Sequence, residues 1–373
     1  MPLRVSNAGG GSNLPNVMIS GTSILPTLSS GTWKDVSYGN GRFVAIATKS
    51  NVCAYSTDGI TWTSSKLPRT SNWQRIIYSS GRFIIISSSL QNAYYSTDGI
   101  TWNVSPLSAT SSFVDMSVGS GIIVMTSSSV DTTMLYSNSN GLDWRSSNMA
   151  TSASWVKSIY TSIPVESSTN INNVFIALAS NSNTINYSID GVNWSAYTYV
   201  LGTDANPNWK SIACNKNIVV VIPSTGDSYR TTSIINRTTW TTRTLPVSTT
   251  WAGIYAFGSK FYLVPTKLNY ILVSSDGITW DTLTMSTFSK VSMIEGGGIY
   301  LLLSSSNTSY WSIDGSSWTG GTKKIIKERK DSDPDKDYEF YGREVTVQDY
   351  TKIYDIDGTD YLDQLQRIVG KNL

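Results

Sequence analysis

Carboxylate side chains are the groups in this sequence whose type and spacing could support chemistry. The chain contains no histidine and only two cysteines, which excludes histidine-assisted nucleophiles and histidine-ligated metal sites. Aspartate recurs five times in one pattern, Ser-x-Asp-Gly-x-x-Trp, as Asp58, Asp98, Asp190, Asp276 and Asp314. A carboxylate in this setting can transfer a proton, or it can accept backbone N–H groups in a turn.

The glycine after each of these aspartates favours the turn, because glycine readily adopts the left-handed conformation. Two further copies of the pattern, residues 137–144 and 233–240, are degenerate: the first has Ser139 in place of the aspartate, and the second lacks both Asp and Gly. We therefore interpret the five aspartates as structural turn residues.

The aspartates belong to a repeat of about 40 residues that occurs seven times. Each unit opens with an aromatic residue and closes with tryptophan, and 12 of the 13 tryptophans lie at one of these two positions. Tryptophan therefore has a packing role that recurs in every unit. The closing residues are Trp62, Trp102, Trp144, Trp194, Trp240, Trp280 and Trp318, and the opening ones are Trp33, Trp73, Phe113, Trp155, Trp209, Trp251 and Phe288.

Each unit contains four short β-type segments. In the first unit they are residues 34–38, 43–47, 52–55 and 61–67, with a Gly-rich turn after the first segment. Four strands in each of seven units predict an all-β fold, a seven-bladed β-propeller of four-stranded blades over residues 17–320. A linear solenoid is the alternative.

The seventh unit argues for the closed ring, because it ends after Trp318 without a fourth strand. At the other end of the chain, Ile24-Leu25-Pro26 precedes Trp33 much as Leu67-Pro68 precedes Trp73. We predict that an N-terminal strand near residues 17–25 completes the last blade, which would remove the free sheet edges.

Charged residues follow the opening aromatics by two positions: Asp35, Arg75, Asp115, Lys157 and Lys290. The innermost strands would bring these residues together as a ring at the channel mouth. Ion pairs between blades and a charged-ligand site are both compatible with this ring. Exposed pairs would contribute about 0–1 kcal/mol each.

The repeats resemble the Asp-box (BNR-type) repeat of sialidases, related glycosidases and photosystem II assembly propellers. The compact Tyr-Ser-x-Asp-Gly-x-x-Trp form, in a chain rich in Ser, Thr and Asn, looks most like the propellers of bacteriophage tail fibres and receptor-binding proteins. The resemblance covers about residues 17–320 and implies a virion protein on the particle exterior, for host-surface binding or particle assembly. In that family the box lies far from the active site.

Two alternatives to this function remain: a glycoside hydrolase acting on host surface glycans, and a cellular assembly-factor propeller. A hydrolase needs two carboxyls that face each other about 5–10 Å apart, yet the repeats hold only Glu166, Glu295 and aspartates mostly placed in turns. We therefore expect no enzyme, no catalytic residue, no metal and no cofactor.

Loops on the face opposite the Asp-Gly turns carry amide, hydroxyl and charged side chains that could bind a host glycan or protein. Solvated loops would have the same composition. The candidate binding residues are Lys49, Asn51, Gln91, Asp131, Asn181, Asp227, Lys267 and Asn307.

The C-terminal residues differ in composition from the repeats. We expect a flexible arm over residues 1–16, a charged linker over residues 321–337 and a small α+β docking segment over residues 338–373. The segment's short helix would dock onto other virion proteins, or onto another copy of this chain. Its apolar stripe is Tyr361, Leu362, Leu365, Ile368 and Val369.

A net charge of +2, with 14% charged residues, does not indicate nucleic-acid binding. No apolar run is long enough to insert into a membrane, and the first residues lack the apolar core of a signal peptide.

Overall fold

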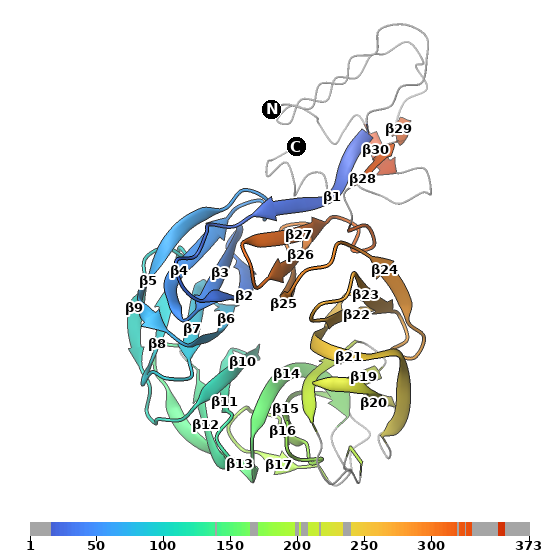
Figure 1. Cartoon of the computed structure of the whole chain (residues 1–373). Helices are drawn as coiled ribbons and strands as arrows, with labels where there is room; N and C mark the ends of the chain where they lie inside the picture. Colours follow the sequence, from blue (N-terminus) through green and yellow to red (C-terminus); the bar gives the residue numbers. More distant parts are fainter. Residues whose placement is uncertain are drawn as a thin grey trace, which may run out of the picture.

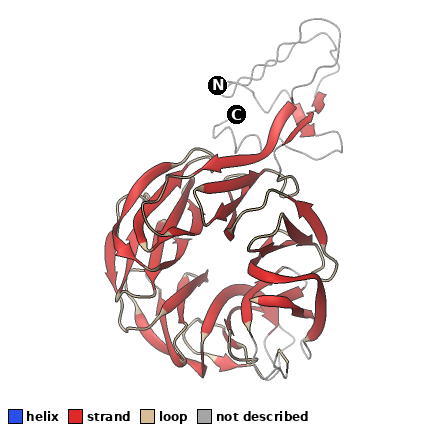
Figure 2. Ribbon diagram, viewed as in Figure 1, coloured by secondary structure: helices blue, strands red, loops and turns tan. Residues whose placement is uncertain are grey.

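The computed structural model describes residues 16–138, 140–164, 171–197, 201–202, 208–215, 218–233, 240–318, 321–324, 326–329 and 350–354. These residues form strands and connecting loops, with no helix among them (Figure 2). The sheets stand side by side around a central axis, so that the chain runs once round a ring (Figure 1).

Four sheets contain four consecutive antiparallel strands each. The first two comprise β2 (Thr32–Gly39), β3 (Arg42–Thr48), β4 (Ser50–Ser56) and β5 (Thr63–Ser71), then β6 (Trp73–Ser79), β7 (Arg82–Ser87), β8 (Asn92–Ser96) and β9 (Asn103–Pro106). The next two comprise β10 (Phe113–Gly119), β11 (Ile122–Ser127), β12 (Asp131–Ser137) and β13 (Arg145–Ala153), then β14 (Trp155–Pro164), β15 (Ile171–Ala179), β16 (Asn186–Ser188) and β17 (Ser195–Ala196).

A seven-stranded sheet follows, because one long strand belongs to two neighbouring groups of strands. The first part of β21 pairs with β20 and its last part, from Trp251, pairs with β22. The strands are β18 (Trp209–Cys214), β19 (Ile218–Pro223), β20 (Thr225–Ser233), β21 (Thr241–Phe257), β22 (Lys260–Pro265), β23 (Tyr270–Ser274) and β24 (Asp281–Thr284).

The last sheet joins the two ends of the ring. Its order is β25 (Lys290–Gly296), β26 (Ile299–Ser304), β27 (Thr308–Ser312), β1 (Asn16–Ile24) and β28 (Gly321–Lys324). Ser20 of β1 lies opposite Ser312 of β27, and Ile24 lies opposite Thr308. The prediction that an N-terminal strand completes the last sheet is confirmed.

Part of the expected charged linker is instead β-structure. β28 pairs with β1 as a fifth strand, and β29 (Ile326–Arg329) pairs with β30 (Tyr350–Tyr354). Residues 1–15 of the N-terminal arm and the five residues of the proposed docking stripe lie outside the described residues.

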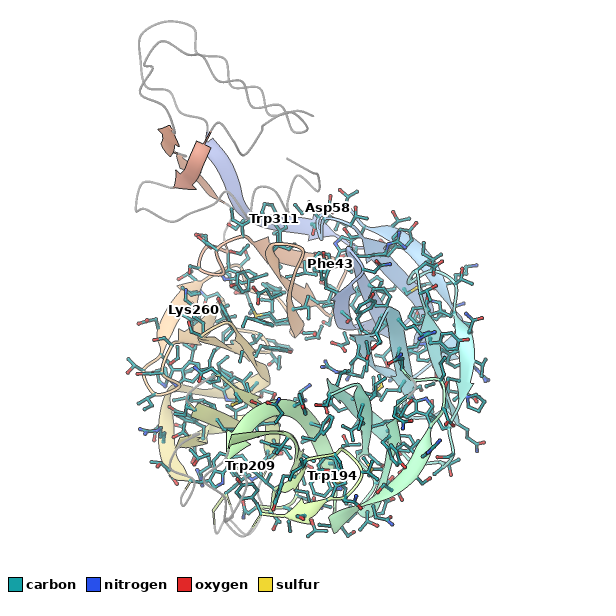
Figure 3. All side chains as sticks on the ribbon, turned by 180° about the vertical axis from the view of Figure 1, so that it is seen from behind. Phe43, Asp58, Trp194, Trp209, Lys260 and Trp311 are labelled. Carbon is teal, nitrogen blue, oxygen red and sulfur yellow. The ribbon has the colours of Figure 1, made fainter. Side chains whose placement is uncertain are left out.

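Apolar side chains from neighbouring sheets form the core, and they fill the spaces between the ribbons (Figure 3). One cluster joins Val44 and Ile46 of β3 with Trp73 and Phe83 of the next sheet, and all four side chains are buried. Because each sheet is covered on both faces, its central strands are almost continuously apolar.

Glycine near the inner strand's end allows close contact between sheets. The ring of Tyr78 lies so close to Gly39 that a Cβ at that position would be 2.0 Å from the ring. Tyr160 stands in the same relation to Gly119. Any larger residue at these glycines would force the inner strands apart.

The Ser-x-Asp-Gly turns have the predicted structural geometry. In the first copy, the N–H groups of Ile60 and Thr61 donate to Asp58 Oδ1 over 2.8 and 2.7 Å, while Gly59 N–H donates to Ser56 Oγ over 2.8 Å. Asp58 lies at the outer edge of the ring (Figure 3). The copies at Asp98, Asp190, Asp276 and Asp314 repeat the two bonds to the carboxylate.

Removal of the closing strand should destabilise the ring. Deletion of residues 1–28 exposes the edge of β27, and we expect a melting temperature lower by about 10 °C. Deletion of residues 1–15 keeps β1 and is the matched control, which should melt like the full chain. Equal melting temperatures for the two deletions would show that β1 contributes nothing to closure.

Acid should destabilise the protein through the turn carboxylates. Burial opposes ionisation of Asp98, Asp190 and Asp276, but hydrogen bonds from nearby backbone N–H groups outweigh it and lower each pKa from 3.8 to about 2. The folded turns therefore stay ionised where the unfolded chain already binds protons, so their stabilisation is complete above about pH 4 and is lost towards pH 2.

A triple variant, Asp98→Asn, Asp190→Asn and Asp276→Asn, tests this pH dependence. Asparagine keeps the acceptor oxygen but does not titrate, so we expect the variant's melting temperature to fall less between pH 4 and pH 2 than that of the wild type. Thermal melts followed by circular dichroism give both slopes. Parallel curves would disprove the role of these carboxylates in acid denaturation.

Candidate functional site

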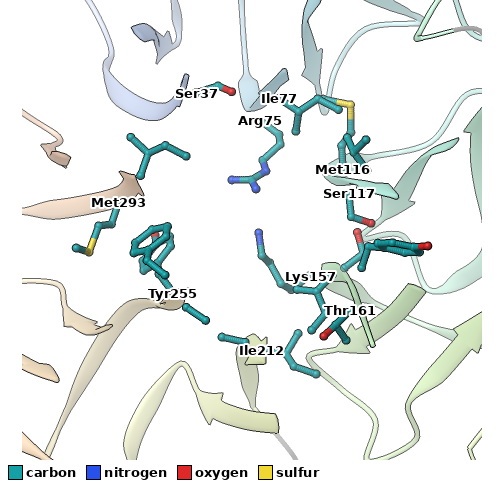
Figure 4. Close-up of a pocket in the computed structure, with 18 of the residues that line it drawn as sticks. Ser37, Arg75, Ile77, Met116, Ser117, Lys157, Thr161, Ile212, Tyr255 and Met293 are labelled. Carbon is teal, nitrogen blue, oxygen red and sulfur yellow. The ribbon is translucent and has the colours of Figure 1, made fainter. Parts of the chain in front are cut away.

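A cavity of about 440 Å³ lies at the centre of the ring. Inner strands of the successive sheets line it, mostly with apolar residues such as Ile77, Met116 and Ile212. Two cationic side chains, Arg75 and Lys157, extend into this space with their charged ends towards each other (Figure 4). The cavity is therefore an apolar channel with positive charge near its centre.

Two buried carboxylates hold these cations in place. Asp35 and Asp115 are each 3% exposed. Arg75 lies between them, with Nη1 3.2 Å from Asp35 Oδ2 and Nε 3.2 Å from Asp115 Oδ1. Lys157 Nζ donates to Asp115 Oδ1 over 3.1 Å. Each of these four residues comes from a different sheet, so the ion pairs link neighbouring sheets.

Backbone and hydroxyl groups complete the shells of both carboxylates. Asp35 Oδ2 accepts the N–H of Ile76 over 3.0 Å, and Asp35 Oδ1 accepts the hydroxyl of Ser292 over 2.7 Å. Asp115 Oδ2 accepts both the N–H and the hydroxyl of Ser158, over 2.7 and 3.1 Å. The carboxylates are therefore fully engaged as fixed anions beneath the two cations.

The local field differs for the two cations. Burial opposes the charge of Arg75, but Asp35 and Asp115 outweigh it and raise its pKa. Burial and the nearby charge of Arg75 lower the pKa of Lys157, although Asp115 and Asp35 oppose the change. The Lys157 ammonium group is therefore the more weakly stabilised of the two charges.

Tyr255 continues this network on the opposite wall of the cavity. Burial and the charge of Asp35 raise its pKa to about 12, so the phenol is neutral near pH 7 and can donate a hydrogen bond. Ser292 and the backbone of Met293 are its hydrogen-bonding neighbours. Sequence reasoning missed Tyr255, because its repeat carries Gly253 at the position where the first four repeats have a charged residue.

Lys290 corrects the predicted ring of charges. It pairs with Ser304 at the start of β25 just as Trp33 pairs with Ala47 in β2, so it occupies the opening aromatic position. It is 1% exposed and does not line the cavity. The residue at the ring position is Ser292, and Phe288 precedes the strand.

The environment of Lys290 explains how a lysine replaces tryptophan there. Its Nζ donates to the carbonyl of Leu268 in the preceding sheet and lies 4.4 Å from the ring centre of Phe288. Trp251 Nε1 donates in the same way to the preceding Gly226 carbonyl. Burial lowers the pKa of Lys290 to about 8. The sequence contains a signal for this position of Lys290. Gly296 follows Lys290 by six residues, just as Gly119 follows the opening aromatic Phe113 by six residues.

Two further lysines lie at the start of inner strands, although neither lines the cavity. Lys34 and Lys210 directly follow Trp33 and Trp209, at β-bulges where the strand register shifts. Partial desolvation lowers the pKa of Lys210, although the residue is exposed, and the charges of Lys34 and Lys157 lower it further. The sequence signal for these residues is the repeated Trp-Lys pair.

None of the eight predicted loop-face residues lines the central cavity. Lys49, Gln91, Asn181 and Lys267 are exposed, and the other four are half-buried. Two of these polar side chains bind backbone N–H groups: Asn181 Oδ1 accepts the N–H of Ser154, which lies between β13 and β14, and Asp131 Oδ1 accepts the N–H of Thr133 in its own strand. The four half-buried residues are Asn51, Asp131, Asp227 and Asn307.

The described residues contain no group of three or more histidine, cysteine or acidic side chains placed to hold a metal. Within the same residues no helix is long and apolar enough to cross a membrane.

No family model matches the sequence, and a search of curated proteins finds no match. Solved structures do match over most of the chain. Virginiamycin B lyase from Staphylococcus aureus has a TM-score of 0.65 at 12% identity, covering 79% of this chain and 99% of the lyase. YCF48 bound to D1 peptide has a TM-score of 0.60 at 14% identity, covering 79% and 94%. The Neurospora crassa Pan2 WD40 domain has a TM-score of 0.55 at 10% identity, covering 76% and 89%.

The chain is a β-propeller. This likeness confirms the coarse fold prediction and corrects the expectation that the protein is not an enzyme, because virginiamycin B lyase is an enzyme with this fold. At 9–14% identity, the likeness shows the fold alone, and it assigns no activity to this propeller.

Loss of one buried carboxylate should lower the free energy of unfolding by more than an exposed ion pair contributes, which is about 0–1 kcal/mol. Asp35→Ala leaves Arg75, Ser292 and the Ile76 N–H without their acceptor, and we expect a loss of about 2–4 kcal/mol in the free energy of unfolding. Urea denaturation measures this loss. Arg145→Ala removes an ion pair whose side chains are 57% and 58% exposed and should leave stability unchanged. Similar, small effects for both variants would contradict a structural role for Asp35.

Proposed function

We propose that this chain is a seven-bladed propeller of the Asp-box type, displayed on the exterior of a bacteriophage particle, where it binds the host surface. The cation-lined channel is the observation that carries the binding role. Arg75 and Lys157 face each other in a cavity of about 440 Å³, and a negatively charged ligand between them would relieve their repulsion.

The turns and the sheets support the proposed type of propeller. Five Ser-x-Asp-Gly turns share one hydrogen-bonding pattern, which fits the resemblance to Asp-box repeats. Counting β21 as the last strand of one blade and the first of the next divides the strands β1–β27 into seven blades of four. The segment 338–373 would mount the propeller on other particle proteins, or on a second copy of this chain.

The neighbouring structures bear on this proposal only through the fold. One of them is a virginiamycin B lyase, made catalytically inactive by replacement of a histidine with alanine, in complex with quinupristin. The present chain contains no histidine, so it cannot use that residue type. YCF48 is a neighbour bound to D1 peptide. A cellular, peptide-binding role is therefore the alternative that the experiments must distinguish.

Mass spectrometry of purified phage particles tests the location. We expect the chain to be present at a fixed ratio to the other particle proteins. Its absence from particles, together with its presence in infected or uninfected cells, would contradict the proposal and favour a cellular role.

A binding assay tests the role of the channel. Fluorescently labelled full-length protein should bind host cells, and Lys157→Met should reduce that binding at least about tenfold because it removes one of the two charges that face the cavity. Lys66→Met is the matched control, since Lys66 is exposed on the outer strand β5. Equal binding by both variants would exclude the channel as the host-binding site.

A further inference from the structure

Four charged side chains meet at the central cavity, and their charges balance. The two cations and the two carboxylates nevertheless differ in exposure. The side chains of Arg75 and Lys157 are 27% and 19% exposed, whereas those of the carboxylates Asp35 and Asp115 are 5% and 4% exposed. Of the four residues, only the two cations line the cavity. A ligand in the cavity therefore meets the cations directly, and the carboxylates lie behind them.

Hydrogen-bond donors on both cations remain available to a ligand. Asp35 engages Nη1 of Arg75 and Asp115 engages Nε, so Nη2 has no ion-pair partner among the described residues. The ammonium group of Lys157 has three N–H groups, and Asp115 accepts one of them. The charged ends of the two cations lie towards each other (Figure 4). A carboxylate has two acceptor oxygens, so it can accept from both cations at once.

The cavity wall offers few acceptors to a ligand. Among the described residues that line it, none is an aspartate, glutamate, asparagine or glutamine. Besides the two cations, its polar side chains carry hydroxyls and the thiol of Cys214. Arginine and lysine are donors only. The wall therefore suits a ligand that supplies its own acceptors at one end, and it suits a ligand with many hydroxyl groups poorly.

Apolar residues follow the cations on the same face of the inner strands. Side chains two residues apart in a strand share a face. Ile77 follows Arg75 by two residues in β6, and Ile159 follows Lys157 by two residues in β14. Ile294 occupies the position in β25 that is equivalent to Ile77. All three isoleucines line the cavity. The cavity is therefore amphipathic along the channel, with the cations at one level and aliphatic side chains at the next.

Aromatic rings continue the apolar wall beyond the isoleucines. Tyr78 and Tyr160 are the next residues in their strands, and both line the cavity. Each ring packs on a glycine of the preceding sheet, Gly39 or Gly119. Each also packs on a phenylalanine of its own sheet, at ring-centre distances of 4.9 and 4.7 Å. These contacts fix the wall, and a wall that need not rearrange binds a ligand at a lower cost.

We propose that the channel binds an aliphatic carboxylate, a fatty acid of medium chain length. The carboxylate lies between Arg75 and Lys157, and the chain runs along Ile77, Ile159 and Ile294. A single negative charge suffices, because the buried carboxylates already balance the cations. A cavity of about 440 Å³ lies within the range of small-molecule sites and would hold a chain of about eight carbons.

The C-terminus of a polypeptide carries the same head group as a fatty acid. Its backbone N–H and C=O groups, however, would need hydrogen-bond partners in the cavity. The isoleucines next to the cations supply none from their side chains, and burial of an unpaired amide is costly. The wall therefore favours the hydrocarbon chain.

This inference rests on the channel as the ligand site of the proposed function, but its test needs neither phage particles nor host cells. Isothermal titration calorimetry of the full chain at two temperatures compares octanoate with shorter carboxylates, octan-1-ol and N-acetylleucine. We expect one octanoate per chain. Affinity should fall about fourfold for each methylene removed, through hexanoate and butanoate to acetate. Octan-1-ol lacks the charge and N-acetylleucine carries an amide, so each should bind at least about tenfold more weakly than octanoate.

Two variants test the head group and the chain separately. Lys157→Met should weaken octanoate binding at least about tenfold, because it removes one of the two cations at the carboxylate, and should leave octan-1-ol binding unchanged. Ile294→Ser should weaken binding of both ligands by the same factor, because it removes apolar contact surface. Lys66→Met and Ile278→Ser are the matched controls. They change exposed residues that do not line the cavity, and they should bind like the wild type.

Each other outcome overturns the inference. Equal affinities for octanoate and acetate would show that the apolar wall does not contribute, and equal affinities for octanoate and octan-1-ol would show that the cations do not. N-acetylleucine that binds as tightly as octanoate would assign the site to a polypeptide C-terminus. Equal binding by each variant and its control would place the octanoate elsewhere. Absence of octanoate binding at both temperatures would reject this ligand class, while the host-cell assay with Lys157→Met would still decide the binding role of the channel.

Discussion

Burial of both faces of every sheet against its neighbours is the constraint on which the rest of this propeller depends. The apolar clusters combine residues of two sheets, as when Val44 and Ile46 pack with Trp73 and Phe83. Since no sheet has a core of its own, each needs a partner on both sides, and only a closed ring supplies one to every sheet. The recurrent tryptophans and the contact of Tyr78 with Gly39 follow from this need for close packing between sheets.

The same packing determines the chemistry of the channel. Inner strands that converge on one axis bring side chains from several sheets into a small space, where charge must be paired to be tolerated. Asp35 and Asp115 supply that pairing, and their remaining lone pairs accept backbone and hydroxyl donors. The carboxylates thus have a mainly structural role, whereas Arg75 and Lys157 retain donors that face the cavity. A site of this kind is rigid, because its first contacts are also the contacts between blades.

The repeat made most of the fold predictable from the sequence, since the spacing of Trp33, Trp73 and their counterparts reports the period directly. The closing strand was predictable because the last unit is incomplete. The burial of Asp35 could not be predicted from the sequence, because the burial of an inner strand depends on how tightly the whole ring converges. Lys290 was assigned to the wrong repeat position because the count started from Phe288 rather than from Gly296. The strand β28 was not predicted, because its charged residues did not suggest pairing with β1. The lysines at the bulges could be seen as Trp-Lys pairs, but a register shift that redirects a side chain is a property of the paired strands.

The pairing of β1 with β27 also has a consequence for the order of folding. Ser20 and Ser312 are opposite each other, although nearly the entire ring separates them along the chain. During synthesis, the N-terminal strand emerges first and must wait, unpaired, until the last sheet has been made. Contacts between such distant residues form slowly, because a long loop has to close before they can form. The earlier sheets can meanwhile stack in order of synthesis. Closure of the ring is therefore expected to be the final and rate-limiting step. Until then β1 is unpaired, and the nascent chain must keep it from pairing with other strands.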